Sequence, residues 1–259
     1  MKWFRIKALL LKYWYVTRQD LARLLDLFYW AILNMIMFGF TTLFLVQQTN
    51  NPSIAVYLIG GIILWFIFLR AQFDACVYFL EEFWSYNDKN LFVTPLRTSE
   101  IVTALGIFAA IRALFTAVIT AAFAYILYYF SIYGGSILAV LYILPIIIFG
   151  WAIGVFALGL IFRYGRTIQV ITWSITLFFQ PFSASYYPVS VLPHWMQIVA
   201  HGLPLVYAFE GYRSAYAGQF SIFNLVVGIL LALVYLVLGS WYLASSIDKS
   251  KTNGKLTDY

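Results

Sequence analysis

The chain has 259 residues, of which 63% are hydrophobic, 20% aromatic and only 10% charged. Soluble domains are about 45–50% apolar and 25% charged, so this composition excludes a water-soluble fold. The net charge of +6 is interpreted as a membrane-topology signal, and no nucleic-acid partner is predicted from it. The apolar runs are long and continuous, which favours transmembrane helices over the short alternating strands of a barrel.

The first 24 residues mix cations with large aromatic side chains. Apolar anchors recur along them at Trp3, Ile6, Leu10, Trp14 and Leu21. This pattern predicts an amphipathic helix over residues 1–24 that lies along the cytoplasmic membrane surface. The alternative is an ordinary cationic flank of the first membrane span.

Six apolar stretches are long enough to cross a hydrocarbon core of about 30 Å, which takes about 20 helical residues. We expect these spans at residues 25–46, 54–80, 100–130, 137–162, 167–187 and 221–245. The predicted fold is therefore an all-α membrane protein with a transmembrane domain over 25–245 and a cytoplasmic tail over 246–259.

Most Lys and Arg residues fall on one side of this arrangement. They precede the first span, follow the last, and occupy the connections between spans two and three and between spans four and five. Only Arg213 lies on the opposite side, while Arg70 and Arg112 fall within spans. By the positive-inside rule, both termini are predicted in the cytoplasm, with the protein in the cytoplasmic (inner) membrane.

The segment YPVSVLPHWMQIVAHGLPL, residues 187–205, is apolar but interrupted by prolines. A seventh span here would place the three lysines of the C-terminal tail outside, so we expect none. The prolines suit helix starts, and two short helices are predicted to form a re-entrant hairpin on the extracytoplasmic side between spans five and six. The fifth span is expected to break at Pro181. The residues assigned to the hairpin are Pro193, Trp195, Pro204, Glu210 and Arg213, of which the last two can pair at their i,i+3 spacing.

A cytoplasmic segment, LEEFWSYNDKNLFVTPLRTSEIVTALG over residues 80–106, combines charges with aromatic side chains. Such a mixture on a short exposed segment suits a protein–protein contact. An interfacial loop whose aromatic side chains sit at the lipid headgroups is the alternative, and the residues alone leave both open.

Three ionisable residues are singled out inside the predicted spans, namely Arg70, Asp74 and Arg112. Arg70 and Asp74 are spaced i,i+4 and can pair on one helix face. Arg112 is expected at a similar depth, so the three can share one network. The network either couples movement of the inner loop to opening of a cavity or only locks spans two and three together.

Several motifs are weak or absent. Gly150 and Gly154 form G-x-x-x-G, which allows close helix packing without naming the partner helix. The sequence contains no G-x-x-x-x-G-K-[ST], no H-E-x-x-H and no G-x-S-x-G. His194 and His201 lack a third metal ligand, and the single Cys76 makes no disulfide within the chain. We therefore predict no catalytic residues, no metal site and no cofactor in this chain.

The run TPLRTSEIVTALG after the aromatic segment, together with YYPVSVLPHWMQIVAHGLPLVYAFEGYRSA before the final span, resembles the permease subunits of type-2 ATP-binding-cassette (ABC-2) exporters. The resemblance covers nearly the whole chain. It implies that the first inner loop docks on a separate ATPase subunit that binds ATP and Mg²⁺. The coupling residues carried over are Glu81, Glu82, Phe83, Trp84, Tyr86, Asp88 and Lys89, with a weaker interface role for Arg163 and Arg166.

The resemblance predicts a transport subunit rather than an enzyme. The expected assembly contains a second permease copy, most simply as a homodimer, two ATPase subunits and the surrounding bilayer. Its cargo is expected to be amphipathic, such as a lipid-linked glycan or polysaccharide, a lipid or a hydrophobic drug. A secondary transporter or channel without an ATPase partner is the alternative, although such proteins usually show inverted repeats or several intramembrane acids.

Overall fold

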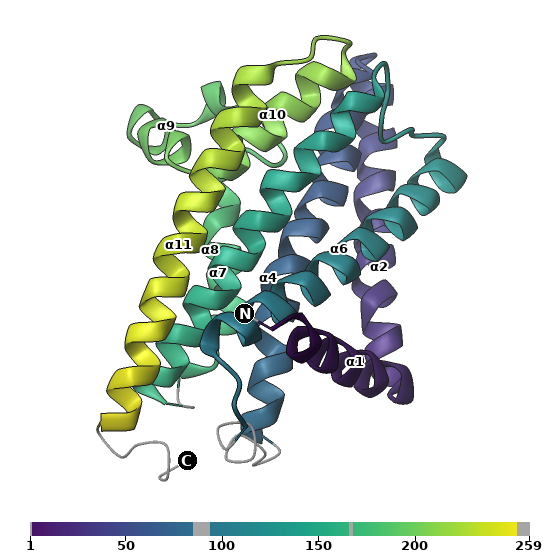
Figure 1. Cartoon of the computed structure of the whole chain (residues 1–259). Helices are drawn as coiled ribbons and strands as arrows, with labels where there is room; N and C mark the ends of the chain where they lie inside the picture. The colour runs from purple at the N-terminus through teal and green to yellow at the C-terminus, as the bar shows by residue number, and fades with distance from the viewer. Residues whose placement is uncertain (1, 85–93, 166–167, 253–259) are drawn as a thin grey trace.

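The computed structural model describes residues 2–84, 94–165 and 168–252, and over these residues the fold is helical, without strands. Figure 1 shows helices running between two ends of the molecule. One end, here called the hairpin end, carries α9 (His194–His201) and α10 (Pro204–Tyr216). The opposite terminal end carries α1 (Trp3–Gln19) and the last turns of α11 (Ile222–Thr252).

Five stretches of the described chain are long and apolar enough to cross a membrane. They match the first four and the last of the six predicted spans. The second combines α3 (Ser53–Ala55), the π-helical η1 (Val56–Gly60) and α4 (Gly61–Trp84), and the fourth combines the 3-10 helix η2 (Ile137–Tyr142) with α7 (Ile143–Tyr164). The five lie at Phe28–Thr49 within α2 (Leu21–Thr49), Ser53–Glu81, Thr98–Tyr128 (α6), Ile137–Tyr164 and Ile222–Lys249.

The predicted fifth span does not form one continuous helix. Its α-helical part is α8 (Ile171–Phe179), whose nine residues rise only about 14 Å, roughly half of a hydrocarbon core. A 3-10 turn, η4 (Gln180–Phe182), follows directly and contains Pro181, so the predicted break is confirmed. Proline has no backbone N–H to continue the α-helical bonding, which explains where α8 ends.

The N-terminal helix also ends earlier than predicted. Asp20 follows α1 in an extended conformation (φ −109°, ψ 103°), so α1 and α2 are separate helices rather than one helix through residue 24. Among the predicted anchors, Ile6 is buried, whereas the side chains of Trp3 and Trp14 are 65% and 54% exposed. The buried stripe of α1 consists of Ile6, Leu9, Tyr13 and Thr17, at the three- to four-residue spacing of one helix face.

A buried glutamate joins the start of α1 to the start of α6. The Glu100 carboxylate accepts hydrogen bonds from the backbone N–H groups of Lys2 (2.7 Å) and Arg97 (3.1 Å). Arg5 Nη1 lies 3.3 Å from the second carboxylate oxygen. The bond to Arg97 is the N3-to-N-cap half of a capping box and fixes where α6 begins. Glu100 therefore serves helix capping and α1 attachment together.

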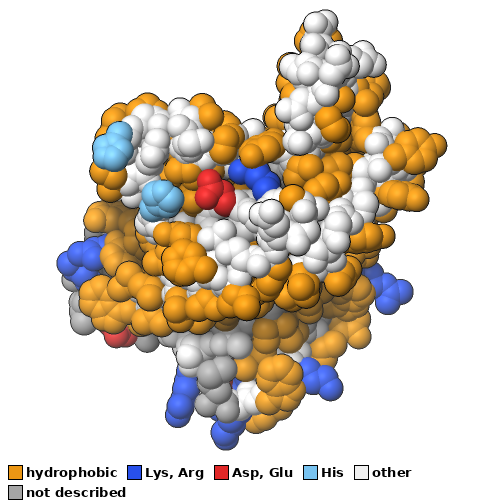
Figure 2. Space-filling model, turned by 90° about the horizontal axis from the view of Figure 1, so that it is seen from above, with side chains coloured by type: hydrophobic (Ala, Val, Ile, Leu, Met, Phe, Trp, Pro, Cys, Tyr) orange, Lys and Arg blue, Asp and Glu red, His pale blue; other side chains and the backbone are white. Residues whose placement is uncertain are grey.

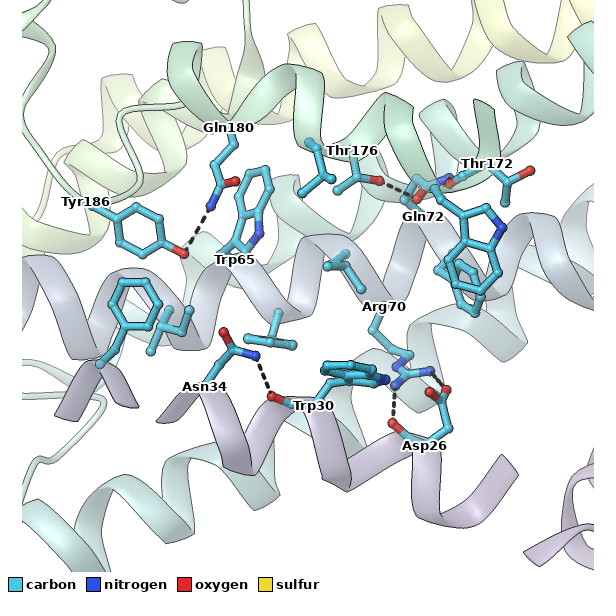
Figure 3. A pocket seen from close by; sticks show the side chains of 17 residues that line it. Asp26, Trp30, Asn34, Trp65, Arg70, Gln72, Thr172, Thr176, Gln180 and Tyr186 are labelled. Atoms are coloured by element: carbon cyan, nitrogen blue, oxygen red, sulfur yellow. Dashed lines mark hydrogen bonds and ion pairs between the residues drawn. The ribbon is translucent and has the colours of Figure 1, made fainter. Parts of the chain in front are cut away.

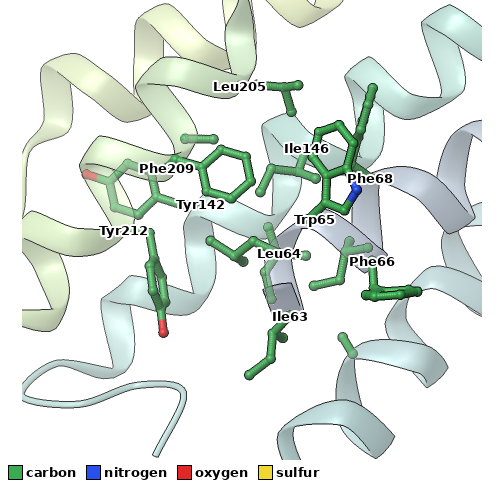
Figure 4. Packing of buried hydrophobic residues seen from close by; sticks show 14 of the residues in the cluster. Ile63, Leu64, Trp65, Phe66, Phe68, Tyr142, Ile146, Leu205, Phe209 and Tyr212 are labelled. Atoms are coloured by element: carbon green, nitrogen blue, oxygen red, sulfur yellow. The ribbon is translucent and has the colours of Figure 1, made fainter. Parts of the chain in front are cut away.

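Two main apolar clusters fill the interior. The cluster nearer the hairpin end joins η1, α4, η2, α7 and α10, and Figure 4 shows its aromatic side chains gathered around α4. In it, the rings of Phe68 and Phe149 stack with centroids 5.4 Å apart. The cluster nearer the terminal end joins α1, α4, α6, α7 and α11. A polar layer at Arg70, Asp74 and Arg112 adjoins both clusters.

The G-x-x-x-G motif of α7 packs against α4. A Cβ atom on Gly150 would lie 2.9 Å from the carbonyl oxygen of Phe68, and one on Gly154 would lie 2.5 Å from that of Gln72. Either contact is too close for a real side chain. The two glycines therefore bring α7 close to the part of α4 that carries the buried charges, which supplies the helix partner that the motif alone could not name.

Candidate functional site

Asp74 on α4 forms the centre of a buried charge network. Its carboxylate lies 2.8 Å from Arg112 Nε on α6 and 3.5 Å from Arg70 Nη1 on α4 itself. The Asp74 side chain is only 2% exposed. The structure thus brings together the three intramembrane charges that the sequence singled out. Burying such charges is tolerated when each has a partner of opposite sign, as here.

Asp26 on α2 is a fourth member that sequence reasoning missed. Arg70 donates from Nη1 to the Asp26 carboxylate (2.9 Å) and from Nη2 to the Asp26 backbone carbonyl (2.8 Å). The Asp26 side chain is 41% exposed, so Arg70 connects a half-exposed acid to a fully buried one. With two arginines and two aspartates, these four residues carry no net charge.

Tyr78 extends the network to α1. Arg112 donates to the Tyr78 hydroxyl, which lies 2.6 Å from Thr17 Oγ1. Because Thr17 Oγ1 already donates to the Tyr13 carbonyl at 2.8 Å, its own proton is used. The Tyr78 hydroxyl therefore donates to Thr17 and accepts from Arg112. The resulting chain of bonds joins α6, α4 and α1.

A groove of about 540 Å³ opens beside this network, between α2, α4 and α8. Figure 3 shows Asp26 and Arg70 toward one part of it and Tyr186 and Gln180 toward the other. Its lining combines polar groups with aromatic faces, and we call it the polar groove. The polar lining is Asp26, Asn34, Arg70, Gln72, Thr172, Thr176, Gln180 and Tyr186, and the aromatic lining is Trp30, Phe38, Trp65, Phe66, Phe73 and Trp173.

A second cavity of about 230 Å³ continues the polar groove toward the charge network. Both cavities are lined by Asp26 and Phe73. The smaller one also reaches Asp74, Arg112 and Glu81. Arg70 and Asp26 therefore line the polar groove itself, whereas Asp74 and Arg112 line the smaller cavity beside it.

Side-chain bonds hold α8 against α4 along one wall of the polar groove. Gln72 Nε2 donates to the carbonyl of Thr172 (3.2 Å), and the Thr176 hydroxyl donates to Gln72 Oε1. The Cys76 thiol, which is fully buried, lies 3.6 Å from Thr172 Oγ1. These contacts position α8 even though it is short.

The hairpin end contains an arginine held in a different way. Arg213 on α10 donates to the backbone carbonyls of Ala184 (2.7 Å), Ser185 (2.6 Å) and Tyr187 (3.3 Å). Its guanidinium carbon lies 4.3 Å from the ring centroid of Tyr57 in η1. Burial lowers the pKa of Arg213 to about 10, so it remains a cation at neutral pH.

The predicted Glu210–Arg213 pair does not form. Glu210 instead accepts a hydrogen bond from the backbone N–H of Val189 (3.2 Å), while Arg213 is turned toward the carbonyls of residues 184–187. The segment before α9 has backbone carbonyls and a backbone N–H group that need hydrogen-bond partners. Arg213 donates to the carbonyls, and Glu210 accepts from the N–H group. Viewed from this end, Figure 2 shows acidic and basic side chains adjoining in a hollow among mainly hydrophobic and uncharged groups.

The other hairpin residues lie close to their predicted places. Pro193 is the N-cap of α9, and Pro204 occupies the first turn of α10. Trp195 is 62% exposed on α9, in keeping with an outward apolar face. In the part of the chain that the structure describes, no group of three or more His, Cys, Asp and Glu side chains could hold a metal ion.

The predicted coupling residues are only partly described. The backbone of α4 extends through Trp84, and the Glu81 side chain forms an ion pair with Arg23 on α2. Arg23 also pairs with Asp20 at 2.9 Å. The side chains of Glu82, Phe83 and Trp84, and all of Tyr86, Asp88, Lys89 and Arg166, lie outside the described residues. Their role in coupling therefore stays a prediction.

The sequence of the chain was compared with curated proteins and with protein-family profiles. A comparison with curated proteins gave no match. The profile of the ABC-2 type transporter family matches residues 6–217, which include all the network residues, both walls of the polar groove, and α9 and α10. Together with the apolar helices, this match makes the chain a multi-pass membrane transport protein that is not itself catalytic. The chain belongs to the family of ABC-2 type transporters.

Proposed function

We propose that this chain is the membrane-spanning permease subunit of an ATP-driven exporter, and that ATP and Mg²⁺ bind to a separate ATPase chain. The family match over residues 6–217 carries this proposal. The sequence adds support because it contains no P-loop motif. The polar groove supplies a place where cargo can be held within the membrane.

The lining of the polar groove suits an amphipathic cargo. Trp30, Trp65 and Phe66 offer apolar faces for a lipid-like part, while Asn34 and Gln180 offer amide groups to a polar part. Ligand sites commonly combine such an apolar lining with a few placed polar groups. Since Arg70 is already neutralised by acids, we favour a polar part that forms hydrogen bonds, such as a glycan, over a strongly charged one.

We further propose that a second copy of the chain covers the open side of the polar groove. The α2 surface beside it exposes Trp30, Met37, Phe40 and Phe44, with exposed fractions of 57–65%. Large apolar patches mark contacts with either lipid or protein. A dimer would enclose cargo between two grooves and remove it from the surrounding lipid.

The terminal end faces the cytoplasm in this proposal, in accordance with the positive-inside rule. α7 ends toward the terminal end and α10 lies at the hairpin end (Figure 1), so the chain between them crosses the molecule through α8, η4 and the 3-10 turn η5 (Val189–Val191). We infer that this interrupted passage is the fifth of six membrane crossings along the chain. The helices α9 and α10 then form the extracytoplasmic re-entrant hairpin, and α1 lies at the cytoplasmic interface.

ATP-driven movement would enter through the segment that follows α4. Glu81, near the end of α4, is linked to Arg23 on α2, and Tyr78 one turn earlier is linked to α1 and α6. A displacement of this end of α4 would therefore act on three other helices. Two of those helices, α2 and α6, carry Asp26 and Arg112, which contact the buried charges beside the polar groove.

Assembly provides the first test. The full chain is co-expressed with a candidate P-loop ATPase of the ATP-binding-cassette type, and co-purification is measured. Charge reversal at Glu82 and Lys89 is expected to abolish the complex without changing the yield of the chain. Lys7→Gln is the matched control, because Lys7 is an exposed cation of α1 at the same end of the molecule. Assembly that survives both reversals would refute the docking assignment.

Transport provides the second test. The complex is reconstituted in liposomes, and ATP-dependent movement of lipid-linked oligosaccharide, fluorescent lipid and hydrophobic dye is measured. In the fraction of Arg112→Leu chain that remains folded, as judged by size-exclusion chromatography, transport is expected to fall if the network couples movement, and Arg112→Lys is the charge-preserving control. Unchanged transport in folded Arg112→Leu would assign the network to packing alone. Cargo movement that needs an ion gradient but no ATPase would favour the secondary-transporter alternative.

A further inference from the structure

A second groove, of about 330 Å³, lies between α7, α8 and α11. We call it the α11 groove. It shares no lining residue with the polar groove, because Thr172 and Thr176 of α8 face the polar groove whereas Ile175 and Phe179 face the α11 groove. The other principal lining residues are Phe156, Leu238, Trp241 and Tyr242, so its walls are almost wholly apolar. It therefore takes no part in the cargo site proposed above.

Close packing of α7 and α11 forms the floor of the α11 groove. A Cβ atom on Gly239 would lie 2.8 Å from the carbonyl oxygen of Ala152, and one on Gly159 would lie 2.7 Å from Tyr242 Cδ1. Because these two glycines have no side chains, the backbones of α7 and α11 can approach closely. The larger lining side chains, such as Phe156 and Trp241, form the sides of the groove. Leu238 and Trp241 are 56% and 69% exposed, so the groove is open at the surface of a membrane protein. A lipid acyl chain matches its apolar lining and its position on this surface.

A cation stands next to this groove on the terminal-end side. Arg163 follows Phe156 by two turns of α7, and its guanidinium carbon lies 5.7 Å from the ring centroid of Tyr242 and 6.0 Å from that of Tyr164. Tyr242 also lines the groove, so the cation and the apolar channel share one side chain. None of the ion pairs among the described residues includes Arg163, which is partly exposed. Its donors are therefore available to an external acceptor.

We propose that the α11 groove and Arg163 together bind an anionic phospholipid. One acyl chain lies in the groove, and the phosphate accepts hydrogen bonds from the Arg163 guanidinium, whose planar fork matches phosphate oxygens. Any phospholipid can supply the acyl chain, whereas the unpaired cation favours a headgroup with net negative charge. Basic side chains at the ends of transmembrane helices commonly attract anionic headgroups. The leaflet follows from the proposed orientation, but binding itself depends on neither ATP nor an ATPase subunit.

Native mass spectrometry of the full chain in detergent tests this site. Phosphatidylglycerol and phosphatidylcholine with identical acyl chains are titrated separately. We expect phosphatidylglycerol to bind about tenfold more tightly, because its headgroup has a net negative charge, whereas the choline ammonium group offsets the phosphate in phosphatidylcholine. Arg163→Gln should remove this preference by weakening phosphatidylglycerol strongly and phosphatidylcholine, whose net charge is zero, much less. Leu238→Trp should fill the groove and weaken both lipids. Lys7→Gln, which removes an exposed cation of α1, should change neither.

Three results would overturn the proposal. The first is an anionic preference that persists in Arg163→Gln, and the second is unaltered binding of both lipids to Leu238→Trp. The third is displacement of phosphatidylglycerol by excess inorganic phosphate, which would make the site a simple anion site. An Arg163→Gln chain that keeps its lipid preference but loses the ATPase subunit would assign Arg163 to docking instead. Because lipid binding is measured without ATPase, its failure is distinguishable from failure of the proposed function.

Discussion

The charge network and the hairpin end bury arginines by different means. In the charge network, Arg70 and Arg112 are neutralised by Asp26 and Asp74, which come from other turns and other helices. At the hairpin end, Arg213 instead meets three backbone carbonyls of a single segment, residues 184–187. The network thus fixes the relative positions of whole helices, whereas Arg213 fixes the local conformation of one connection.

The local backbone explains why Arg213 can act alone. Ala184 has a positive φ of 54°, which is uncommon for a residue with a side chain. This conformation turns successive carbonyls of the segment toward α10, where the Arg213 guanidinium can reach them. Removing one partner of the charge network should therefore weaken the packing of whole helices. Removing Arg213 should increase the local mobility of residues 184–187 without separating the transmembrane helices.

Removal of Asp74 is expected to have the largest effect. Asp74→Ala leaves Arg112 buried without a carboxylate, and breaking a buried ion pair in this way costs about 3–5 kcal/mol. For a chain of this size the melting temperature should fall by on the order of 10 °C. The measurement is thermal unfolding of the purified chain in detergent, followed by circular dichroism.

Two variants separate lost charge balance from lost packing. Asp74→Asn keeps the size of the side chain, so a similar loss of stability would show that charge matters. The double variant Asp74→Ala, Arg112→Leu removes both charges and should recover part of the loss. A melting temperature that is unchanged in Asp74→Ala would mean that Arg112 finds another partner, and the network would then not be the element that joins α4 to α6.

Removal of Arg213 should have a smaller and more local effect. Arg213→Leu leaves the carbonyls of Ala184 and Ser185 without their donor, which costs about 2–3 kcal/mol once water replaces part of the lost bonding. Hydrogen exchange at residues 183–192 should become faster, while exchange in α4 and α6 stays unchanged. Arg213→Lys should give an intermediate result, because one ammonium cannot reproduce the planar fork. Faster exchange throughout α4 would contradict the distinction between the charge network and the hairpin end.

Close helix packing supports the network and is expected to have the next largest effect. In Gly154→Ala the added methyl group would meet the Gln72 carbonyl at 2.5 Å, so α7 must move away from α4. Such overpacking should cost about 1–2 kcal/mol of the free energy of unfolding. Gly202→Ala in the hairpin is the matched control, since its Cβ would meet only Val199 O, at 3.2 Å. Equal destabilisation by both would contradict the special role of the α4–α7 contact.

The sequence was sufficient where a pattern depends on one helix. Apolar length located the five helices that can span a membrane, and the missing N–H of Pro181 located the break after α8. The i,i+4 spacing of Arg70 and Asp74 and the similar depth of Arg112 correctly brought these three residues together. In each case, helix geometry or the lack of a backbone donor relates residue number directly to position.

Contacts between helices distant in sequence were harder to predict. Asp26 falls within the first predicted span, and its charge there could have marked it as a member of the network. Only the packing of α2 beside α4 shows that its partner is Arg70. Glu210 and Arg213 had a suitable spacing for a pair, yet the irregular segment 184–189 offers both side chains backbone partners. Sequence spacing describes neighbours along a helix and carries no information about such competing groups.

The smallest effect on stability is expected for the Arg23–Glu81 pair, which joins the start of α2 to the end of α4. The side chains are 27% and 26% exposed, and pairs near the surface contribute about 1 kcal/mol or less. Glu81→Gln and Arg23→Gln should therefore shift the melting temperature only slightly, and a double-mutant cycle should give a small coupling energy.

If the pair transmits movement, both variants should reduce ATP-driven transport equally, and the exchanged pair Arg23→Glu, Glu81→Arg should restore it. If Glu81→Gln alone weakens co-purification with the ATPase, Glu81 serves docking directly, and the internal link to α2 is incidental.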